Sequence, residues 1–386
     1  MATILCVLYP DPQAGYPPPA VRDSIPDVPW QVGGEDAPKP EAPLGFTPGE
    51  LVGSVSGELG LRDYLENNGH ELLVTSDKDG EDSAFERLLP KADVVISQPF
   101  WPGYLTKERI AKAKKLKLAI TAGIGSDHVD LDAAAEADIT VAEVTGSNSE
   151  SVAEHVVMMT LALVRNYLPS HAIAQAGGWN IADCVSRAYD VKGMSFGAVG
   201  GGAIGMGALR RLQPFGLDLH YSKRHRLDEE TEKELDLSYH EDIGEMAKEM
   251  DILSLQIPLY PATRHIIDAD MLSSMKRGTY LINCGRGELV DPDAVVEAVH
   301  SGQLAGYAGD VWNPQPPSAE DPWRTMPFNG MTPHVSGTTL SAQARYAAGA
   351  LDILQRFLEG TGIEEDYLII DGGDLAGTGS STYQLS

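Results

Sequence analysis

Residues that can bind a small polar ligand follow short apolar segments typical of strands. The segments SQPFW, TAGIGSDHV, VTGSNSE and NCGRG carry them directly after such a run, and MTPHVSG adds another late in the chain: Pro99, Phe100, Ile124, Asn148, Arg286 and His334. Open parallel sheets bind ligands beyond the carboxyl ends of their strands. We therefore expect these residues to meet in one cleft. The structural alternatives are an ion pair for Arg286, a core position for His334 and a helix N-cap for Asn148.

A glycine-rich segment has the pattern of a phosphate-binding turn. Residues 200–205 read GGGAIG, directly after the strand-like FGAV and before the helix-like MGALRRLQPF. The first glycine permits a tight turn, the second admits a pyrophosphate, and the third packs the helix on the strand. The following helix N-terminus adds partial positive charge. This context predicts a dinucleotide site, although a glycine turn needed only for packing has the same pattern.

The residues after the next predicted strand, LDLHY, point to the kind of dinucleotide. NAD sites commonly place a carboxylate there to accept hydrogen bonds from the ribose. This chain has Ser222, Lys223 and Arg224 instead, followed by two further basic residues. Lys and Arg attract a 2′-phosphate that a carboxylate would repel. We therefore predict that NADP is accepted, and the alternative is a set of solvated surface charges.

Longer segments of the chain resemble a known family. They are SQPFWPGYLT, TAGIGSDHVDL, SVAEHVVMM, RHRL after the second strand of the dinucleotide unit, YAGDVW and PWRTMPFNGMTPHVSGTTLSAQARYAAG. In these segments the chain resembles the metal-independent, NAD(P)-dependent formate dehydrogenases of bacterial type, a branch of the D-2-hydroxy-acid dehydrogenase superfamily. The resemblance extends from residue 1 to about residue 372 and includes the Pro-rich arm.

The resemblance implies how the substrate is bound. Arg286 pairs with the formate carboxylate, Asn148 donates a hydrogen bond to the same anion, and Ile124 contacts it through its backbone. Pro99 and Phe100 form an apolar surface that excludes water from formate. Catalysis then consists of positioning and electrostatics.

The resemblance also pairs His334 with Gln315 beside the nicotinamide. Oxidation of formate is a hydride transfer without removal of a hydroxyl proton, so a general base is not required. In the 2-hydroxy-acid branch a Glu holds the catalytic His as an imidazolium, which the neutral amide of Gln315 cannot do. A D-2-hydroxy-acid dehydrogenase and a non-catalytic NAD(P)-sensing protein remain the alternatives.

The expected cofactor-binding residues follow from the glycine turn, the basic strand end and the resemblance. They are Gly200, Gly202, Ala203, Ile204, Gly205, Ser222, Lys223, Arg224, Pro258, Thr263, Asp310, Ser336 and Gly337. Several positions depart from the family pattern. Ala203 replaces a usual Arg and Lys223 a usual Asp, Gly200 and Gly201 stand where alanines are frequent, and Ile257 and Tyr260 stand where a Cys and a His are common. The first two changes alter the charge around the adenosine phosphates, and together the departures put NAD preference in doubt. No metal is expected.

The elements that position these residues alternate between strand-like and helix-like segments. Strands such as ADVVISQ and LAITAG alternate with helical segments, which is typical of parallel βαβ units. We predict an α/β fold with two doubly wound, Rossmann-like domains and the active site in the cleft between them. Residues 1–148 and 337–386 form the expected substrate domain, and residues 149–336 form the NAD(P)-binding domain. The Gly- and Ser-rich tail is expected to be loosely ordered.

Composition and charge exclude several classes of protein. Hydrophobic residues make up 42% of the 386 residues, enough for large buried cores, and no apolar run approaches the roughly 18 residues of a membrane span. With 29 Lys and Arg against 56 Asp and Glu, the net charge is −27, which argues against nucleic-acid and anionic-membrane partners.

Compartment and assembly are expected from other features. The three separated cysteines favour a reducing compartment, and the N-terminus resembles a first strand more than a signal peptide, so a cytoplasmic location is expected. A long apolar helix over residues 151–167 is either an ordinary core helix or part of a subunit interface. The resemblance implies a homodimer formed through the cofactor domain.

Overall fold

The computed structural model describes residues 1–11, 51–378, 380, 383 and 385 of the chain. The Pro-rich arm expected near the N-terminus lies mostly outside these residues. The chain divides into two compact units, each described by itself. The first unit consists of Met1–Asn148 and Gly337–Ser386, and the second unit of Ser149–Ser336.

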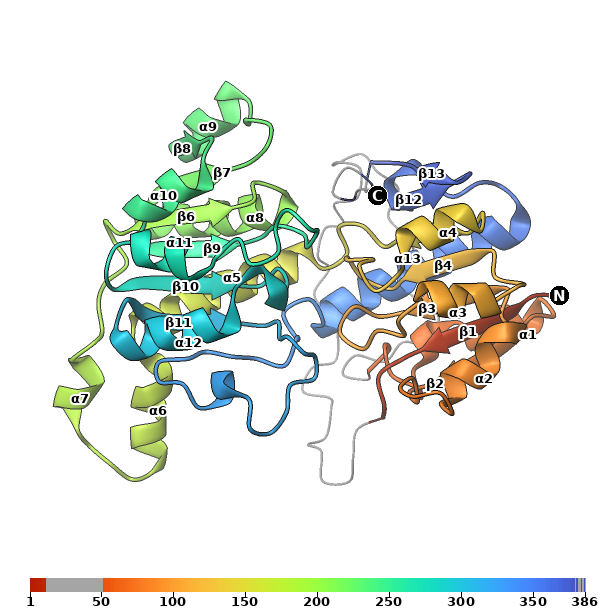
Figure 1. Ribbon diagram of the computed structural model, residues 1–386, viewed down its shortest axis with the longest axis horizontal. Coiled ribbons are helices and arrows are strands. Elements are labelled where there is room, and N and C mark those ends of the chain that lie inside the picture. Colours follow the sequence, from red (N-terminus) through yellow and green to blue (C-terminus); the bar gives the residue numbers. More distant parts are fainter. Residues whose placement is uncertain (12–50, 379, 381–382, 384, 386) are drawn as a thin grey trace. The chain divides into compact units, whose positions relative to one another are not determined.

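A seven-stranded sheet forms the centre of the first unit, in the order β13-β12-β5-β4-β3-β1-β2 (Figure 1). Strands β1 to β5 pair in parallel, whereas β12 and β13 add antiparallel pairs at one edge. The strands are β1 (Thr3–Val7), β2 (Glu71–Thr75), β3 (Val94–Ser97), β4 (Leu118–Thr121), β5 (Thr140–Glu143), β12 (Leu368–Asp371) and β13 (Asp374–Leu375).

Helices cover both faces of this sheet because its central strands are apolar on both sides. In β4, Leu118 and Ile120 pack in one core cluster with residues of α1 and α13, whereas Ala119 packs in another with residues of α2, α3 and α4. Successive strand residues point to opposite faces, so the alternation identifies a doubly covered sheet. The helices are α1 (Arg62–Asn67), α2 (Ala84–Leu88), α3 (Lys107–Lys112), α4 (Leu131–Glu136) and α13 (Leu340–Glu359).

The second unit contains a six-stranded, fully parallel sheet in the order β11-β10-β9-β6-β7-β8. With β6 as the first strand, this is the Rossmann order 3-2-1-4-5-6. The chain changes direction across the sheet between β6 and β9, which is where such folds bind ligands. The strands are β6 (Ser195–Val199), β7 (Asp218–Ser222), β8 (Leu237–His240), β9 (Ile252–Leu255), β10 (Thr279–Asn283) and β11 (Leu304–Gly309).

The helices of the second unit are also divided between two faces. Phe196 and Ile282 pack in a core cluster with residues of α5 and α8, whereas Leu253 and Leu281 pack with residues of α10, α11 and α12. The helices are α5 (Ser149–Val164), α6 (Tyr167–Gln175), α7 (Ile181–Val185), α8 (Ala203–Leu212), α9 (Glu229–Leu235), α10 (Ile243–Glu249), α11 (Ala269–Ser274) and α12 (Pro292–Ser301).

The predicted fold class is confirmed, since both units are parallel-sheet α/β layers. Two details differ from expectation. The helix predicted over residues 151–167 ends at Val164, because Asn166 has a left-handed backbone (φ 51°) and α6 begins after it. In the described residues of the tail, β13 pairs with β12 and the Tyr383 hydroxyl makes hydrogen bonds to Ser126 and Glu143, so these residues are more ordered than expected.

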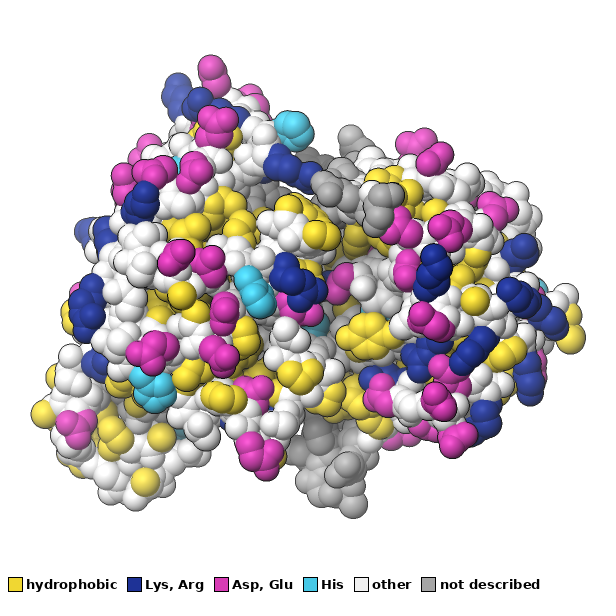
Figure 2. All heavy atoms as spheres, in the orientation of Figure 1, with side chains coloured by type: hydrophobic (Ala, Val, Ile, Leu, Met, Phe, Trp, Pro, Cys, Tyr) yellow, Lys and Arg dark blue, Asp and Glu magenta, His cyan; other side chains and the backbone are white. Residues whose placement is uncertain are grey.

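The surface agrees with an acidic chain. Figure 2 shows acidic side chains spread over the visible face of each unit, with Lys and Arg among them. Within the described residues, none of the helices has the length and apolarity needed to cross a membrane.

Candidate active site

The glycine turn after β6 is built by close backbone contacts. Gly200 has a φ of 111°, and a Cβ there would lie 2.5 Å from the Gln256 carbonyl oxygen in the loop after β9. A Cβ at Gly205 would lie 1.9 Å from the Gly200 carbonyl oxygen. Neither position accommodates a side chain, so both glycines are required by the backbone path.

The same turn leaves space where a phosphate would bind. Gly202 is exposed, and a Cβ there would meet nothing within 4 Å. No side chain caps the N-terminus of α8, which begins directly after it at Ala203. The first N–H groups of a helix need partners, and an anion supplies them. These residues therefore fit a dinucleotide pyrophosphate, and Ile204 packs its side chain inward against the core.

The end of β7 places Lys223 beside the glycine turn. The Ser222 carbonyl accepts a hydrogen bond from Gly200 N–H (2.9 Å), and a Cβ at Gly201 would lie 3.4 Å from Lys223 Cδ. The Tyr239 hydroxyl donates to the Lys223 carbonyl (3.2 Å). Lys223 is half-buried and Arg224 is exposed, so two basic side chains follow the strand in place of a carboxylate.

A buried carboxylate holds the remainder of this basic loop. Glu232 in α9 accepts two hydrogen bonds from the Arg226 guanidinium (2.8 and 2.7 Å) and one from the Tyr221 hydroxyl. These donors lower the pKa of Glu232 to about 2. The Tyr221 hydroxyl also accepts from Leu227 N–H (3.0 Å), so the loop is fixed at its distal end.

Two predicted cofactor residues lie in the loop after β9, at the same edge of the sheet. The Thr263 hydroxyl donates within its own loop toward the Pro258 carbonyl (2.9 Å) and accepts from Tyr260 N–H (3.0 Å). Thr263 is 7% exposed. Its side chain therefore fixes the loop shape, and a direct contact of Thr263 with the cofactor remains a prediction.

Arg286 follows β10 in a turn that a buried amide supports. The Asn283 side chain donates to the Arg286 carbonyl (2.9 Å) and accepts from Gly285 N–H (3.1 Å). Arg286 is half-buried, and its Nη1 donates to the Gly285 carbonyl (2.9 Å). A Cβ at Gly287 would lie 2.5 Å from the Trp312 backbone, so the turn fits closely against the segment that leads to Gln315. Asn283 was not among the residues predicted from the sequence.

His334 and Gln315 form the pair predicted from the resemblance. His334 Nδ1 lies 2.9 Å from Gln315 Oε1. The imidazole is half-buried, and its residue has a left-handed backbone with φ 56°. A positive φ is uncommon for His, so the surrounding segment must hold this conformation.

Asp310 supplies that support. It follows β11, is fully buried, and its carboxylate accepts from Val335 N–H (2.8 Å), Ser336 N–H (2.7 Å) and the Thr332 hydroxyl (2.6 Å). His155 Nε2 lies 3.1 Å from the same hydroxyl. The Asp310 carboxylate therefore binds the backbone N–H groups of the two residues that follow His334, Val335 and Ser336. The sequence did not reveal this supporting role of Asp310.

In the first unit, Asn148 directly precedes α5 and lies against Gly337. A Cβ at Gly337 would lie 2.6 Å from Asn148 Nδ2, so only glycine leaves room for this amide. Asn148 Oδ1 is buried and has no hydrogen-bond partner among the described residues. Buried polar atoms rarely lack partners. This oxygen is an acceptor and cannot bind a carboxylate, so the formate contact predicted for Asn148 would use the Nδ2 donor and remains a prediction.

Pro99, Phe100 and Ile124 follow β3 and β4 at one edge of the first sheet. The Pro99 ring lies 3.0 Å from where a Cβ of Gly123 would be, so Pro99 covers the loop that carries Ile124. The Phe100 ring packs between Tyr9 and Tyr346, with centroid distances of 6.4 and 6.5 Å. These residues are half-buried and present an apolar surface.

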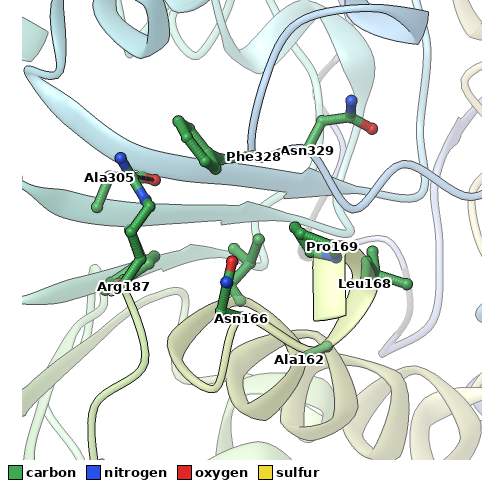
Figure 3. A pocket seen from close by; sticks show the side chains of 10 residues that line it. Ala162, Asn166, Leu168, Pro169, Arg187, Ala305, Phe328 and Asn329 are labelled. Carbon is green, nitrogen blue, oxygen red and sulfur yellow. Dashed lines mark hydrogen bonds between the residues drawn. The ribbon is translucent and has the colours of Figure 1, made fainter. Parts of the chain in front are cut away.

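A cavity in the second unit contains none of the predicted site residues. It lies beside α5 and α6, where Arg187 stacks on the Phe328 ring and donates to the Ala305 carbonyl (2.6 Å), as Figure 3 shows. In the part of the chain that the structure describes, no three His, Cys, Asp or Glu side chains form a cluster suited to a metal ion.

Comparisons with known sequences place the chain in a family. A family model for the NAD-binding domain of D-isomer specific 2-hydroxyacid dehydrogenases matches residues 157–336. The chain is 62% identical to the formate dehydrogenase of Pseudomonas sp. (strain 101), over 99% of this chain and 95% of that protein. It is 47% identical to the chloroplastic/mitochondrial formate dehydrogenase of Arabidopsis thaliana, over 84% of this chain and 85% of that protein.

Solved structures agree. Granulicella m. formate dehydrogenase is 60% identical, with a TM-score of 0.94 over 98% of this chain and all of that chain. The NAD-dependent formate dehydrogenase of Staphylococcus aureus, solved with NAD, is 39% identical, with a TM-score of 0.80 over 95% of this chain and 99% of that one. The resemblance predicted from the sequence is confirmed, and this chain belongs to the formate dehydrogenases within the D-isomer specific 2-hydroxyacid dehydrogenase family.

Proposed function

We propose that this protein oxidises formate to CO2 by direct hydride transfer to NAD+ or NADP+. The observation that carries the proposal is the pairing of His334 Nδ1 with the neutral amide of Gln315 at 2.9 Å. A neutral partner does not stabilise an imidazolium, and formate oxidation needs no base to remove a hydroxyl proton. When bound, the nicotinamide ring accepts the hydride.

Arg286 and Asn148 orient the anion in this proposal. The guanidinium binds the formate carboxylate, and the Asn148 amide donates a further hydrogen bond, so the C–H bond is held in one direction. Oxidation converts an anion into neutral CO2. The product therefore loses its charge-assisted bond to Arg286 and is released.

The remaining residues control solvent and geometry. Pro99 and Phe100 exclude water from the substrate, which strengthens the electrostatic contacts of Arg286. Ile124 contributes a backbone N–H to the carboxylate. The Asp310 network keeps His334 in its left-handed conformation.

The test is a comparison of substrates with the wild-type enzyme and Arg286→Ala. We expect formate to be oxidised, glyoxylate and pyruvate to be reduced poorly, and Arg286→Ala to lose turnover. Reduction of a 2-keto acid faster than oxidation of formate would favour the hydroxy-acid dehydrogenase alternative. Cofactor binding without turnover of either substrate class would favour a sensing protein.

NADP+ acceptance is the second part of the proposal. Lys223 lies beside Gly201 of the phosphate turn, where its ammonium group could meet a 2′-phosphate, and Arg224 follows it in the sequence. Lys and Arg bind phosphate through charge-assisted hydrogen bonds. Titration of NADPH and NADH against wild-type protein and Lys223→Asp tests this directly, and we expect the substitution to weaken NADPH selectively.

A homodimer formed through the second unit completes the proposal. The helices α6 and α7 and their connections expose large apolar side chains, among them Tyr167 (57%), Trp179 (88%) and Ile181 (62%). In Figure 1 these helices extend away from the sheet of their own unit. Exposed apolar patches of this kind mark protein interfaces. A cytoplasmic location remains a prediction from the sequence.

A further inference from the structure

A buried carboxylate that the proposed mechanism does not use lies at the end of β5. Glu143 is 3% exposed, and its Oε2 accepts three hydrogen bonds: from Gly125 N–H (3.0 Å), the Ser126 hydroxyl (3.0 Å) and the Tyr383 hydroxyl (2.7 Å). Burial of a carboxylate is costly unless hydrogen bonds compensate it. Two of the three donors, Gly125 N–H and the Ser126 hydroxyl, belong to the loop after β4.

The Tyr383 hydroxyl completes a ring of hydrogen bonds. It donates to Glu143 and accepts from Ser126 N–H (2.7 Å), although 257 residues separate Tyr383 from Ser126. Burial and the neighbouring Glu143 raise the pKa of Tyr383 well above its usual value, so the hydroxyl keeps its proton and remains a donor. Tyr383 and Leu385 also pack against the core cluster that contains β4 and β5 residues.

The loop held in this way is the one that carries Ile124. Gly123 and Gly125, on either side of it, have φ values of 139° and 110°. A Gly-Ile-Gly sequence has many backbone conformations available, so contacts from outside must select one. Pro99 packs on the Gly123 side, and the bonds of Glu143 and Tyr383 fix the Gly125–Ser126 side.

We propose that Tyr383 is a positioning residue for formate: through Glu143 and Ser126 it fixes the direction of the Ile124 backbone N–H. This inference rests on the proposed contact between Ile124 and the formate carboxylate. It assigns to Tyr383 a role in substrate affinity that needs no contact between its side chain and the reacting atoms.

The test is Tyr383→Phe, which removes the hydroxyl and keeps the ring in the core. We expect KM for formate to rise roughly three- to tenfold, as for the loss of one or two hydrogen bonds that hold the loop. The KM for the cofactor should stay at its wild-type value, whereas the Tm should fall moderately because Glu143 and Ser126 N–H each lose a hydrogen-bond partner. Tyr64→Phe in α1, which removes a hydroxyl elsewhere in the same unit, is the matched control.

A double-substitution cycle with Glu143→Gln separates positioning from stability. If Tyr383 acts through Glu143, the double variant raises the formate KM by less than the product of the fold-changes in the two single variants. Equal rises in formate and cofactor KM would show a structural role only. An unchanged formate KM in Tyr383→Phe would overturn the inference.

Ile124→Pro removes the backbone N–H itself and links the inference to the proposed function. We expect this variant to lose formate affinity more strongly than Tyr383→Phe. If the wild-type protein oxidises formate and Ile124→Pro has the same formate KM, both the Ile124 contact and the positioning role are wrong. If Ile124→Pro has a raised formate KM but Tyr383→Phe has the wild-type value, the positioning role alone is wrong.

Discussion

At the scale of single residues, Gln315 determines which kind of group lies beside the His334 imidazole. A carboxylate at the same 2.9 Å distance would attract an imidazolium by its charge, whereas the amide is neutral. The reaction converts an anion into a neutral product. A second positive charge beside the substrate, in addition to that of Arg286, would therefore stabilise the ground state more than the transition state without improving its orientation.

We predict that Gln315→Glu lowers kcat for formate by roughly tenfold, which corresponds to about 1.4 kcal/mol of ground-state stabilisation. The variant should also gain reduction of glyoxylate, because an imidazolium can donate a proton. The pH profile of kcat measures the change. The control is Gln213→Glu, which adds the same charge after the C-terminus of α8, at the opposite edge of the sheet from His334. A pH profile equal to that of wild type would contradict the role given to Gln315.

The residue scale also shows where sequence reasoning stops. The pattern MTPHVSG and the segment YAGDVW predicted that His334 and Asp310 are functional. Only the structure shows that Asp310 accepts hydrogen bonds from Val335, Ser336 and Thr332. Such contacts depend on side-chain directions across a fold, which spacing along a chain does not encode. Tyr383 and Glu143 were missed for the same reason.

At the scale of elements, the turn between β6 and α8 separates packing from binding. A Cβ at Gly205 would overlap the Gly200 carbonyl, whereas a Cβ at Gly202 would enter open space. We predict that Gly205→Ala lowers stability by about 1–3 kcal/mol or more. We predict that Gly202→Ala keeps the wild-type Tm but raises KM for the cofactor. Thermal melts and cofactor titrations of both variants test this, and an unchanged cofactor KM in Gly202→Ala would show that the turn does not hold the pyrophosphate.

The loop after β7 gives a prediction on pH. The bonds from Arg226 and Tyr221 lower the pKa of Glu232 from about 4.5 to about 2. A depressed carboxyl pKa stabilises the fold fully above the unfolded value, and the stabilisation is lost as pH falls through the folded value. The Tm difference between wild type and Glu232→Gln should therefore be constant above about pH 4.5 and shrink toward about pH 2. A difference independent of pH would contradict the depressed pKa.

The short elements explain which parts of the fold the sequence did not predict. The buried strands β6, β9 and β10 are apolar runs and were recognised. Strand β8 (Leu237–His240) is four residues long, mostly exposed or half-buried, and lies at the sheet edge, so its sequence carries no period that distinguishes it from a loop. Strand β12 pairs with the distant β5, whereas β13 pairs with β12 across the Gly372-Gly373 turn, a hairpin inside a segment that was expected to be loosely ordered.

At the scale of the whole molecule, the exposed apolar side chains of α6, α7 and their connections predict self-association. Trp179 is 88% exposed and Ile181 is 62% exposed. We predict that the wild-type protein sediments as a dimer and that Trp179→Asp together with Ile181→Asp shifts it toward the monomer. Phe215→Asp, at a half-exposed apolar site elsewhere on the second unit, is the control. A wild-type monomer at working concentration would contradict the interface.

The net charge of the whole chain is −27, whereas the loop at the end of β7 is locally basic. Lys223 and Arg224 form a local positive site on an acidic chain, and a 2′-phosphate is the part of NADP+ that distinguishes it from NAD+. The central claim is therefore that this formate dehydrogenase uses NADP+.

The most direct measurement is kcat/KM for NADP+ and for NAD+ with saturating formate, on wild type and on Lys223→Asp. We predict that wild type uses NADP+ at least as efficiently as NAD+. Lys223→Asp should lower the efficiency with NADP+ by about a hundredfold, as expected when a charge-assisted contact is replaced by a repulsive one, and leave NAD+ nearly unchanged. A wild type that turns over only NAD+, or a Lys223→Asp variant with an unchanged preference, would contradict the claim.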